Sequence, residues 1–327
     1  MEFEFKKITS HEDLGRLTEL MYLCFGLKVD DSYFKWKYFD NPAGQAIVYE
    51  ALYNGKTVGS YGIIPEFYWI DGVVKKTYQA VEAMTHPNFQ RKGLFVKLAQ
   101  LVLQDSLQQN KEILMIAFPG AQSIGGFINK LNWKLINNCN YIFLPNFLFK
   151  LKNHNKSNTD FHIVKFNEAN DMLLNYLEAT QPHTKISKVI NKEIFRWKIL
   201  DNPRLKYNTI GIVNNSELIG ISVYRVDYQN TCLINWLHFN DEPNYKIYTP
   251  IFLQHIFKET NIKYIYTWNS KSEPLSQAYE KCGFITNPFN LGPFHSKLPF
   301  AIYQQGFSKD NGLQIFKNYD FQPIILD

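Results

Sequence analysis

This sequence of 327 residues has few cysteines, no long apolar run and no strong excess of one charge. Its four cysteines, Cys24, Cys139, Cys232 and Cys282, are far apart and form no CxxC pair, which indicates neither a metal site nor a disulfide framework. No apolar run approaches the roughly 20 residues that cross a bilayer, and the amino-terminal MEFEFKKIT lacks the apolar centre of a signal peptide. We therefore expect no bound metal, no membrane span and a cytoplasmic location.

The charge balance is mild, with a formal net charge of +5 and no basic run. This excess suits a small anionic ligand but falls short of the basic patch of a nucleic-acid-binding protein, so no nucleic-acid partner is expected. The hydrophobic content of 45% is that of an ordinary globular protein. The length exceeds that of one average core, which favours two domains.

A ten-residue motif occurs twice along the chain. Tyr33–Pro42 reads YFKWKYFDNP and Ile194–Pro203 reads IFRWKILDNP, with six identical positions. Each copy predicts a short helix with aromatic residues on one face, ended at the proline. Trp36 and Trp197 could stack on a ligand, but both copies retain them, and we interpret them as packing residues.

The segments around the two copies also correspond. A predicted strand and helix precede each copy, and two strands joined by a tight turn follow it, with Asn54-Gly55 as the first such turn. The polar stretch 150–160 is the predicted linker. We predict an α/β protein with two domains, 1–150 and 151–327, related by duplication. Each is expected to be a mixed sheet with helices on its faces.

The stretch 77–107 has the features of a diphosphate site. A predicted strand, Thr77–Thr85, is followed by a His-Pro corner, by the basic loop Gln90–Gly93 and by a helix with a regular apolar face. The first amides of a helix lack carbonyl partners and lie at the positive end of the helix dipole. Because the loop adds two cations and a glycine that permits close approach, it predicts the binding of a diphosphate.

This stretch, continued by a strand at 112–118 and a helix around Phe127–Lys130, resembles the acetyl-CoA-binding core of the GNAT (GCN5-related N-acetyltransferase) superfamily. The family loop reads Q/R-x-x-G-x-G/A, and Phe95 stands here in place of the last small residue. The pattern THPNFQRKGLF followed by FPGAQSIGGFINKLNW is similar to bacterial proteins with two GNAT halves, many of them linked to surface-polysaccharide pathways. The resemblance implies two tandem GNAT-like domains and acetyl-CoA as co-substrate.

In that family, backbone amides of the strand before the loop bind the pantetheine arm and the thioester. The residues to which the resemblance assigns cofactor binding are Ala83, Met84, Thr85, Gln90, Arg91, Lys92, Gly93, Leu94, Phe95 and Phe127.

Glu82 is the candidate general base. It is the sole carboxylate on an otherwise apolar predicted strand, and family relatives of this type carry an acidic residue at the matching position. It could instead be a structural residue paired with a lysine. The position of the family tyrosine that protonates the departing thiolate holds Ile128. The general acid is therefore open, with Ser123, Tyr61 and Tyr78 as alternatives to solvent.

The second half lacks a comparable loop. It carries Asp241, Glu242 and Pro243 where the first half has its basic residues, and carboxylates repel a diphosphate. We therefore expect that this half does not bind CoA in the same way and that it serves the acceptor side or the structure. Tyr279 matches the family tyrosine by its place four residues before Gly283, but without a cofactor loop it is interpreted as structural.

These observations predict an acetyl-CoA-dependent N-acetyltransferase that acts on a small amine. The resemblance suggests an amino sugar first, free or nucleotide-linked. Two alternatives remain, a transferase with a longer acyl or an aminoacyl donor and a non-catalytic CoA-binding protein. The acceptor, the acyl-chain length and the oligomeric state are left open.

Overall fold

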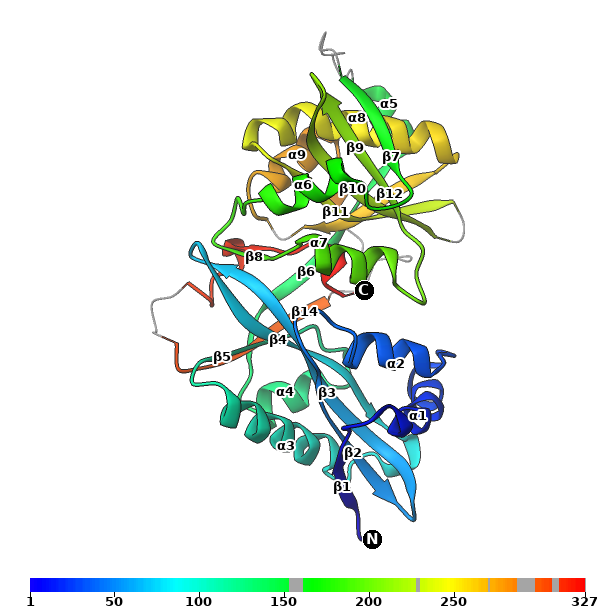
Figure 1. Ribbon diagram of the computed structural model, residues 1–327, viewed down its shortest axis with the longest axis vertical. Coiled ribbons are helices and arrows are strands. Elements are labelled where there is room, and N and C mark those ends of the chain that lie inside the picture. The colour runs from blue at the N-terminus through cyan, green and yellow to red at the C-terminus, as the bar shows by residue number, and fades with distance from the viewer. Residues whose placement is uncertain (153–160, 228–229, 270, 287–297, 308–311, 327) are drawn as a thin grey trace.

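The computed structural model consists of two α/β halves that lie one above the other along the long axis (Figure 1). The structure describes residues 1–152, 161–227, 230–269, 271–286, 298–307 and 312–326. Within these ranges, no helix has the length and apolar character needed to cross a bilayer. The same residues contain no group of His, Cys, Asp and Glu side chains that could hold a metal ion.

The main elements of the first half are β1 (Glu4–Lys7), α1 (Gly15–Phe25), α2 (Asp31–Tyr38), β2 (Ile47–Tyr53), β3 (Lys56–Ile70), β4 (Val73–Thr85), α3 (Leu94–Gln109), β5 (Ile113–Ala117), α4 (Ile124–Lys130), β6 (Lys134–Pro145) and α5 (Asn146–Leu151). Those of the second half are β7 (Phe161–Phe166), α6 (Asp171–Ala179), β8 (Ile186–Lys188), α7 (Lys192–Phe195), β9 (Asn208–Asn214), β10 (Glu217–Asp227), β11 (Thr231–Phe239), α8 (Glu242–Thr260), β12 (Tyr264–Asn269), α9 (Leu275–Cys282), β13 (Ile285–Thr286), β14 (Leu298–Gln305) and β15 (Tyr319–Asp320). Short 3-10 turns cover His11–Asp13, Pro87–Phe89, Phe316–Asn318 and Pro323–Ile325, and a π-helical turn covers Arg196–Leu200.

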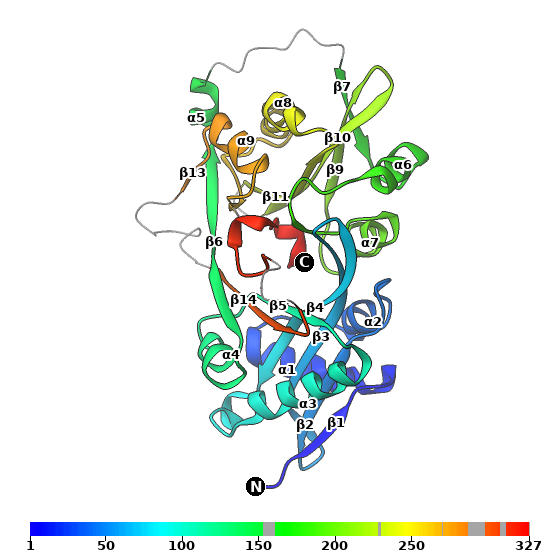
Figure 2. The same ribbon diagram turned by 90° about the vertical axis from the view of Figure 1, so that its left-hand side faces the viewer.

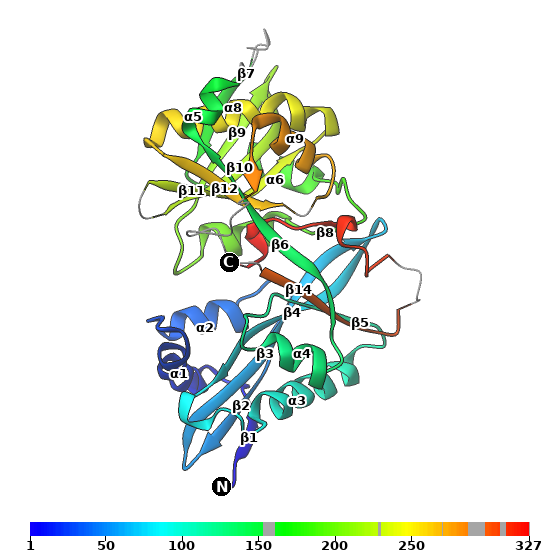
Figure 3. The ribbon, with the colours of Figure 1, turned by 180° about the vertical axis from the view of Figure 1, so that it is seen from behind.

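The two halves exchange strands. The continuous sheet runs in the order β1-β2-β3-β4-β5-β14-β6-β12-β11-β10-β9-β7. Residues 134–139 of β6 pair with β14, and residues 140–145 pair with β12, so β6 passes from the lower sheet into the upper one (Figure 2). In return β14, from the second half of the sequence, lies between β5 and β6 of the first half (Figure 3). Each half is thus completed by a strand from the other.

Local sequence accounts for many of the elements. The Asn54-Gly55 turn between β2 and β3 has positive φ values of 49° and 74°, which these two residue types tolerate best. The side chains of Asn170 and Asn191 accept hydrogen bonds from the first turns of α6 and α7, as helix caps do. The prediction of an α/β protein with a mixed sheet is confirmed. The start of the predicted linker belongs to α5, and residues 153–160 lie outside the described residues.

One hydrophobic core joins the halves. It contains Tyr68 and Ile116 from the first half, Trp236 from the second, and Phe321 and Ile325 near the carboxyl end of the chain. All five side chains are at most 5% exposed. Because apolar surface of both halves is buried in the same cluster, their separation would expose it to water, and the relative position of the halves is fixed by hydrophobic packing. The predicted division at residue 150 stays a prediction.

Candidate active site

β4 and β5 run parallel and then diverge. Within the described chain, only Tyr78 and Gln79 of β4 are in register with β5. The opposite edge of β4 pairs with β3, where Glu82 and Ala83 together lie opposite Tyr61 in a β-bulge. The carboxyl end of β4 therefore borders a V-shaped gap.

The backbone of β4 directs amides into this gap. The His86 amide donates to the Val58 carbonyl of β3 at 2.9 Å. Successive amides of a strand point in opposite directions, so the amides of Thr85 and Ala83 point away from β3 and towards the gap, while that of Met84 points towards β3. Two of the three predicted amides thus face the gap.

A cleft of about 620 Å³ extends from the gap across the start of α3, and we call it the first-half cleft. Its lining residues are Cys24, Phe25, Ala83, Thr85, Pro87, Phe89, Gln90, Arg91, Gly93, Leu94, Phe95, Val96, Gln122, Ser123 and Gly126. Most of the residues predicted for cofactor binding are therefore brought together.

The loop before α3 has the geometry of an anion site. Arg91 and Gly93 both have positive φ values, 62° and 78°, and successive turns of this kind can direct neighbouring amides towards a bound anion. A Cβ atom on Gly93 would meet no atom within 4 Å, and the residue lines the cleft. The first amides of α3 follow at once, so a positive dipole end and the Arg91 cation act at the same place.

Phe95, the departure from the family loop, is accommodated by α4. Its ring contacts Tyr61 and Phe127, with centroid distances of 5.7 Å and 5.2 Å. A Cβ atom on Gly126 would lie 2.6 Å from the Phe95 ring. The absence of a side chain at Gly126 therefore leaves room for the Phe95 ring.

Three predicted residues lie outside the cleft lining, and seven lining residues were not foreseen. Met84 is 1% exposed on the face covered by α1, Phe127 is buried against Trp133, and Lys92 is exposed to solvent beside the loop. The lining residues missed by the sequence analysis are Cys24, Phe25, Pro87, Phe89, Val96, Gln122 and Gly126. No motif marks Cys24 and Phe25, because only the fold brings the end of α1 next to the loop before α3.

Glu82 lies in a buried cluster on the face covered by α2. One carboxylate oxygen forms an ion pair with Lys37 and accepts from the Tyr33 hydroxyl at 3.1 Å, and the other accepts from the Tyr38 hydroxyl at 3.0 Å. The Lys37 and Glu82 side chains are 10% and 6% exposed. The lysine partner considered from the sequence is therefore present, and it comes from the first copy of the repeated motif.

The cluster is electrostatically coupled and adjacent to the gap. Burial opposes the charged form of Lys37, but the Glu82 carboxylate and the Tyr33 hydroxyl together outweigh burial and raise the pKa of Lys37 above its usual range. Burial and the same carboxylate raise the pKa of the Tyr33 hydroxyl, which therefore remains a donor at neutral pH. Glu82 itself has a φ of 40°, a strained value for this residue type, at the bulge that precedes Ala83.

The candidate acids differ in their access to the cleft. Ser123 lines it, and its hydroxyl donates to the Gly120 carbonyl at 3.2 Å. Tyr61 is 2% exposed and lies behind Phe95, while the Tyr78 hydroxyl accepts from Asn110 at 3.0 Å. Ile128, in the family tyrosine position, carries no proton donor. Of the hydroxyls considered from the sequence, Ser123 is the one that the cleft exposes.

The corresponding gap of the second half is filled by the chain itself. In the part of the chain that the structure describes, β11 pairs with β12 along Thr231–Leu233 and no further. Further along β11, the Leu237 amide donates to the side chain of Gln322 at 2.7 Å, and the Gln322 side-chain amide donates back to the Leu237 carbonyl at 3.1 Å. Gln322 is 3% exposed, so the carboxyl-terminal segment occupies this place. Tyr279 is 1% exposed in the core against Phe284.

The fold is that of tandem GNAT proteins. A tandem GNAT protein from the clavulanic acid biosynthesis pathway superimposes with a TM-score of 0.61 at 12% identity, over 94% of this chain and 100% of that protein. A GCN5-related N-acetyltransferase from Anabaena variabilis gives a TM-score of 0.66 at 13% identity, over 91% of this chain and 72% of the other. The N-myristoyltransferase of Saccharomyces cerevisiae, with bound myristoyl-CoA, gives a TM-score of 0.59 at 12% identity, over 97% of this chain and 83% of the other.

One family model matches part of the first half. Residues 4–136 match the family described as the acetyltransferase (GNAT) domain. The predicted resemblance and the predicted tandem GNAT-like fold are thereby confirmed. No curated protein sequence matches the chain.

Proposed function

We propose that this protein is an acetyl-CoA-dependent N-acetyltransferase of a small amine. The observation that carries the proposal is the first-half cleft, in which a basic, glycine-bearing loop and the start of α3 meet the gap between β4 and β5. The coarser class, an acyl-CoA N-acyltransferase, follows from the GNAT domain at residues 4–136. An amino sugar, free or nucleotide-linked, is the acceptor class that we would test first. We expect the enzyme to act in the cytoplasm.

The lining residues suit the parts of an acyl-CoA. The amides at the start of α3, with Gly93 and Arg91, would hold the diphosphate. The amides of Ala83 and Thr85 would pair with the pantetheine arm and the thioester carbonyl, whose developing negative charge they would stabilise. The bound thioester supplies the acyl group.

The chemistry needs one proton acceptor and one proton donor. The amine nitrogen attacks the thioester carbonyl carbon, the carbon–sulfur bond breaks, and the thiolate takes up a proton as the amide product loses one. We assign the acceptance of the amine proton to Glu82, which retains a lone pair on the oxygen bonded to Tyr38. The sulfur can receive its proton from the Ser123 hydroxyl or from water in the cleft.

The cluster of Tyr61, Phe95 and Phe127 favours a short acyl group. These rings contact one another beside the cleft, and Phe95 fills the space over Gly126. A longer acyl donor is the second candidate, because the yeast enzyme of the same tandem fold holds myristoyl-CoA. A series of acyl-CoA donors of increasing chain length separates the two, since the aromatic cluster should make turnover fall steeply beyond a few carbons.

A turnover assay tests the proposal. Acetyl-CoA and a panel of amino sugars and nucleotide-linked amino sugars would be incubated with the protein, with release of CoA followed by a thiol reagent and the product identified by mass spectrometry. We expect acetylation of at least one amine, and no acetylation by the Gly93→Asp variant. CoA binding without turnover on any amine would favour a non-catalytic CoA-binding protein instead.

A further inference from the structure

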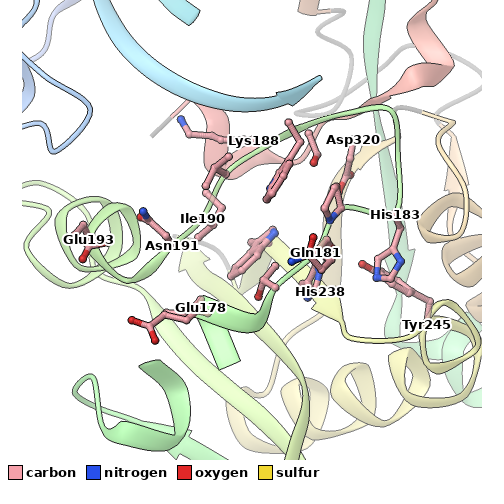
Figure 4. A pocket seen from close by; sticks show the side chains of 17 residues that line it. Glu178, Gln181, His183, Lys188, Ile190, Asn191, Glu193, His238, Tyr245 and Asp320 are labelled. Carbon is pink, nitrogen blue, oxygen red and sulfur yellow. Dashed lines mark hydrogen bonds between the residues drawn. The ribbon is translucent and has the colours of Figure 1, made fainter. Parts of the chain in front are cut away.

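A second cavity lies on the other side of the molecule's shared core. Its volume is about 320 Å³, and we call it the second-half pocket. Figure 4 shows its walls, which come from the segment after α6, the segment from β8 into α7, the end of β11, the first turn of α8 and β15. Trp69 of β3 closes it from the first half. The volume suits a small molecule of the size that pockets of this kind bind.

The second-half pocket is remote from the first-half cleft. Trp69 lies eight residues beyond Tyr61 along β3, and Tyr61 lies opposite the bulge at Glu82 and Ala83. A strand rises about 3.3 Å per residue, so the two sites are separated by roughly 26 Å. A small molecule in this pocket cannot reach the proposed thioester position.

The pocket contains a carboxylate with few partners. Among the described residues, Asp320 accepts hydrogen bonds only from the Gln322 side-chain amide, at 3.2 Å and 3.4 Å. The nearby ammonium of Lys188 is already paired with Glu66, and both of these side chains are at most 4% exposed. The pocket therefore presents a negative charge that its own lysine does not neutralise.

The buried His238 does not supply that positive charge at neutral pH. The His238 ring is bonded to the Tyr176 hydroxyl at 2.8 Å and to the Gln181 carbonyl at 3.2 Å. Burial lowers the pKa of His238 to about 3, against the effect of the Gln181 carbonyl, so this ring stays neutral. The His183 ring is bonded to the Phe239 carbonyl at 2.7 Å and is turned towards the backbone.

Aromatic rings form the remaining wall. Trp236, His238 and His183 stack in series, with centroid distances of 5.7 Å and 5.4 Å, and Tyr245 stands edge-on to His183. Aromatic faces attract cations through the negative charge of their π-systems, most strongly when water is excluded. An ammonium group would thus find both a counter-ion and aromatic faces here.

We propose that the second-half pocket binds a small organic amine as its ammonium form, with Asp320 as the counter-ion. The amine is bound and not acylated, because the neighbouring gap beside β11 is filled by Gln322 and has no basic loop. The proposal concerns a binding site and does not depend on the acetyl acceptor of the first half.

Isothermal titration calorimetry with the full chain tests the pocket. The probe is 2-phenylethylamine, and N-acetyl-2-phenylethylamine is the matched neutral compound. We expect saturable binding of the amine at neutral pH and at least tenfold weaker binding of the neutral compound. Equal binding of the two compounds, or no binding of the amine at millimolar concentration, would overturn the proposal.

Variants assign the binding to this pocket. Asp320→Asn should weaken binding of the amine at least tenfold. Glu193→Gln removes another carboxylate of the lining and should change the amine affinity by no more than about twofold. Glu82→Gln should leave the amine affinity unchanged, because Glu82 belongs to the other site. If Asp320→Asn binds the amine as tightly as the natural chain, or if Glu82→Gln abolishes binding, the amine is not held by Asp320. Acetyl-CoA binding, measured in parallel, reports on the fold of each variant.

Discussion

The indole N–H of Trp36 donates to the Trp197 carbonyl at 2.8 Å, and the indole N–H of Trp197 donates to the Trp36 carbonyl at 2.9 Å. The two rings stack with a centroid distance of 4.9 Å and an interplanar angle of 24°. These residues occupy the same place in the two copies of the repeated motif, so the copies meet in a locally symmetric pair. Both rings are 6% exposed, as packing residues are.

Replacing either tryptophan should cost similar stability. Trp36→Phe and Trp197→Phe each remove one indole donor and leave a buried carbonyl without it, which costs ~1–3 kcal/mol. Chemical denaturation of both variants measures the loss. As a control, Trp69→Phe changes a partly exposed tryptophan outside the pair and should cost less. Markedly unequal losses at 36 and 197 would contradict the symmetric arrangement.

We expect one CoA site per chain. The first-half cleft is open, whereas Gln322 occupies the corresponding gap of the second half through both backbone groups of Leu237. Calorimetric titration with CoA should therefore give a stoichiometry of about one. Two equivalent sites would show that CoA displaces the carboxyl-terminal segment around Gln322 from the second gap.

Gly93→Asp should weaken CoA binding at least a hundredfold, or about 3 kcal/mol. The new side chain would enter the open cleft, place a negative charge where the diphosphate is expected, and require a φ of 78° that aspartate adopts at a cost. Gly55→Asp is the matched control, because Gly55 also has a positive φ and free space around it but lies in a distant turn. If the two variants bind CoA with equal affinity, the diphosphate does not bind at this loop.

Glu82→Gln should reduce kcat by ~10²–10⁴ if Glu82 is the general base. The change also leaves the Lys37 ammonium buried without its counter-ion, which destabilises proteins by ~3–5 kcal/mol. CoA affinity should change little, since the carboxylate faces away from the cofactor cleft. Steady-state kinetics and thermal unfolding measure the two effects separately.

The double variant Lys37→Met/Glu82→Gln tests whether Glu82 acts as the general base or only as the structural partner of Lys37. It removes both charges of the ion pair and should regain much of the lost stability. If Glu82 accepts the amine proton, kcat stays low in the double variant. Recovery of turnover together with stability would make Glu82 a packing residue, and solvent would then deprotonate the amine.

Asp320 should make stability depend on pH in the acid range. Burial raises the pKa of this carboxyl from 3.8 to about 6, against the effect of the Gln322 amide and the nearby His183. The folded state then binds the proton more tightly than the unfolded state, so this residue's contribution to stability falls as pH rises from about 4 to about 6, by up to ~3 kcal/mol. Asp320→Asn should flatten this part of the pH profile relative to the natural chain, as measured by denaturation at each pH. If the pH profiles of Asp320→Asn and of the natural chain are parallel, the Asp320 carboxyl lies in a more solvated environment than the structure shows.

Local sequence features predicted the elements that local physics determines. The strands predicted before the two motif copies are present as β1 and β7, and the Asn54-Gly55 turn and the loop before α3 lie where their residues indicate. The position of Glu82 on a strand beside the loop was also predictable. The sequence pattern therefore predicted the type of these elements and the chemistry of their residues.

Contacts between distant segments were not predictable from these patterns. Lys37 meets Glu82 across 45 residues, and Gln322 meets Leu237 across 85. Neither partner carries a signal for the other, because a lysine in an aromatic helix and a glutamine near the carboxyl end are compatible with many surroundings. The missing loop predicted that the second half would not bind CoA in the same way, but it did not predict that Gln322 would occupy the gap beside β11.

The position of β14 has a consequence for synthesis of the chain. The strand between β5 and β6 is β14, which comes from residues 298–305. The sheet of the first half therefore stays incomplete while the second half is being translated. At roughly 5–20 residues per second, the interval between β5 and β14 lasts about 10–40 s. During that time the edge of β5 is an unpaired strand on the nascent chain, and a chaperone that shields such edges would act on the first half before it acts on the second.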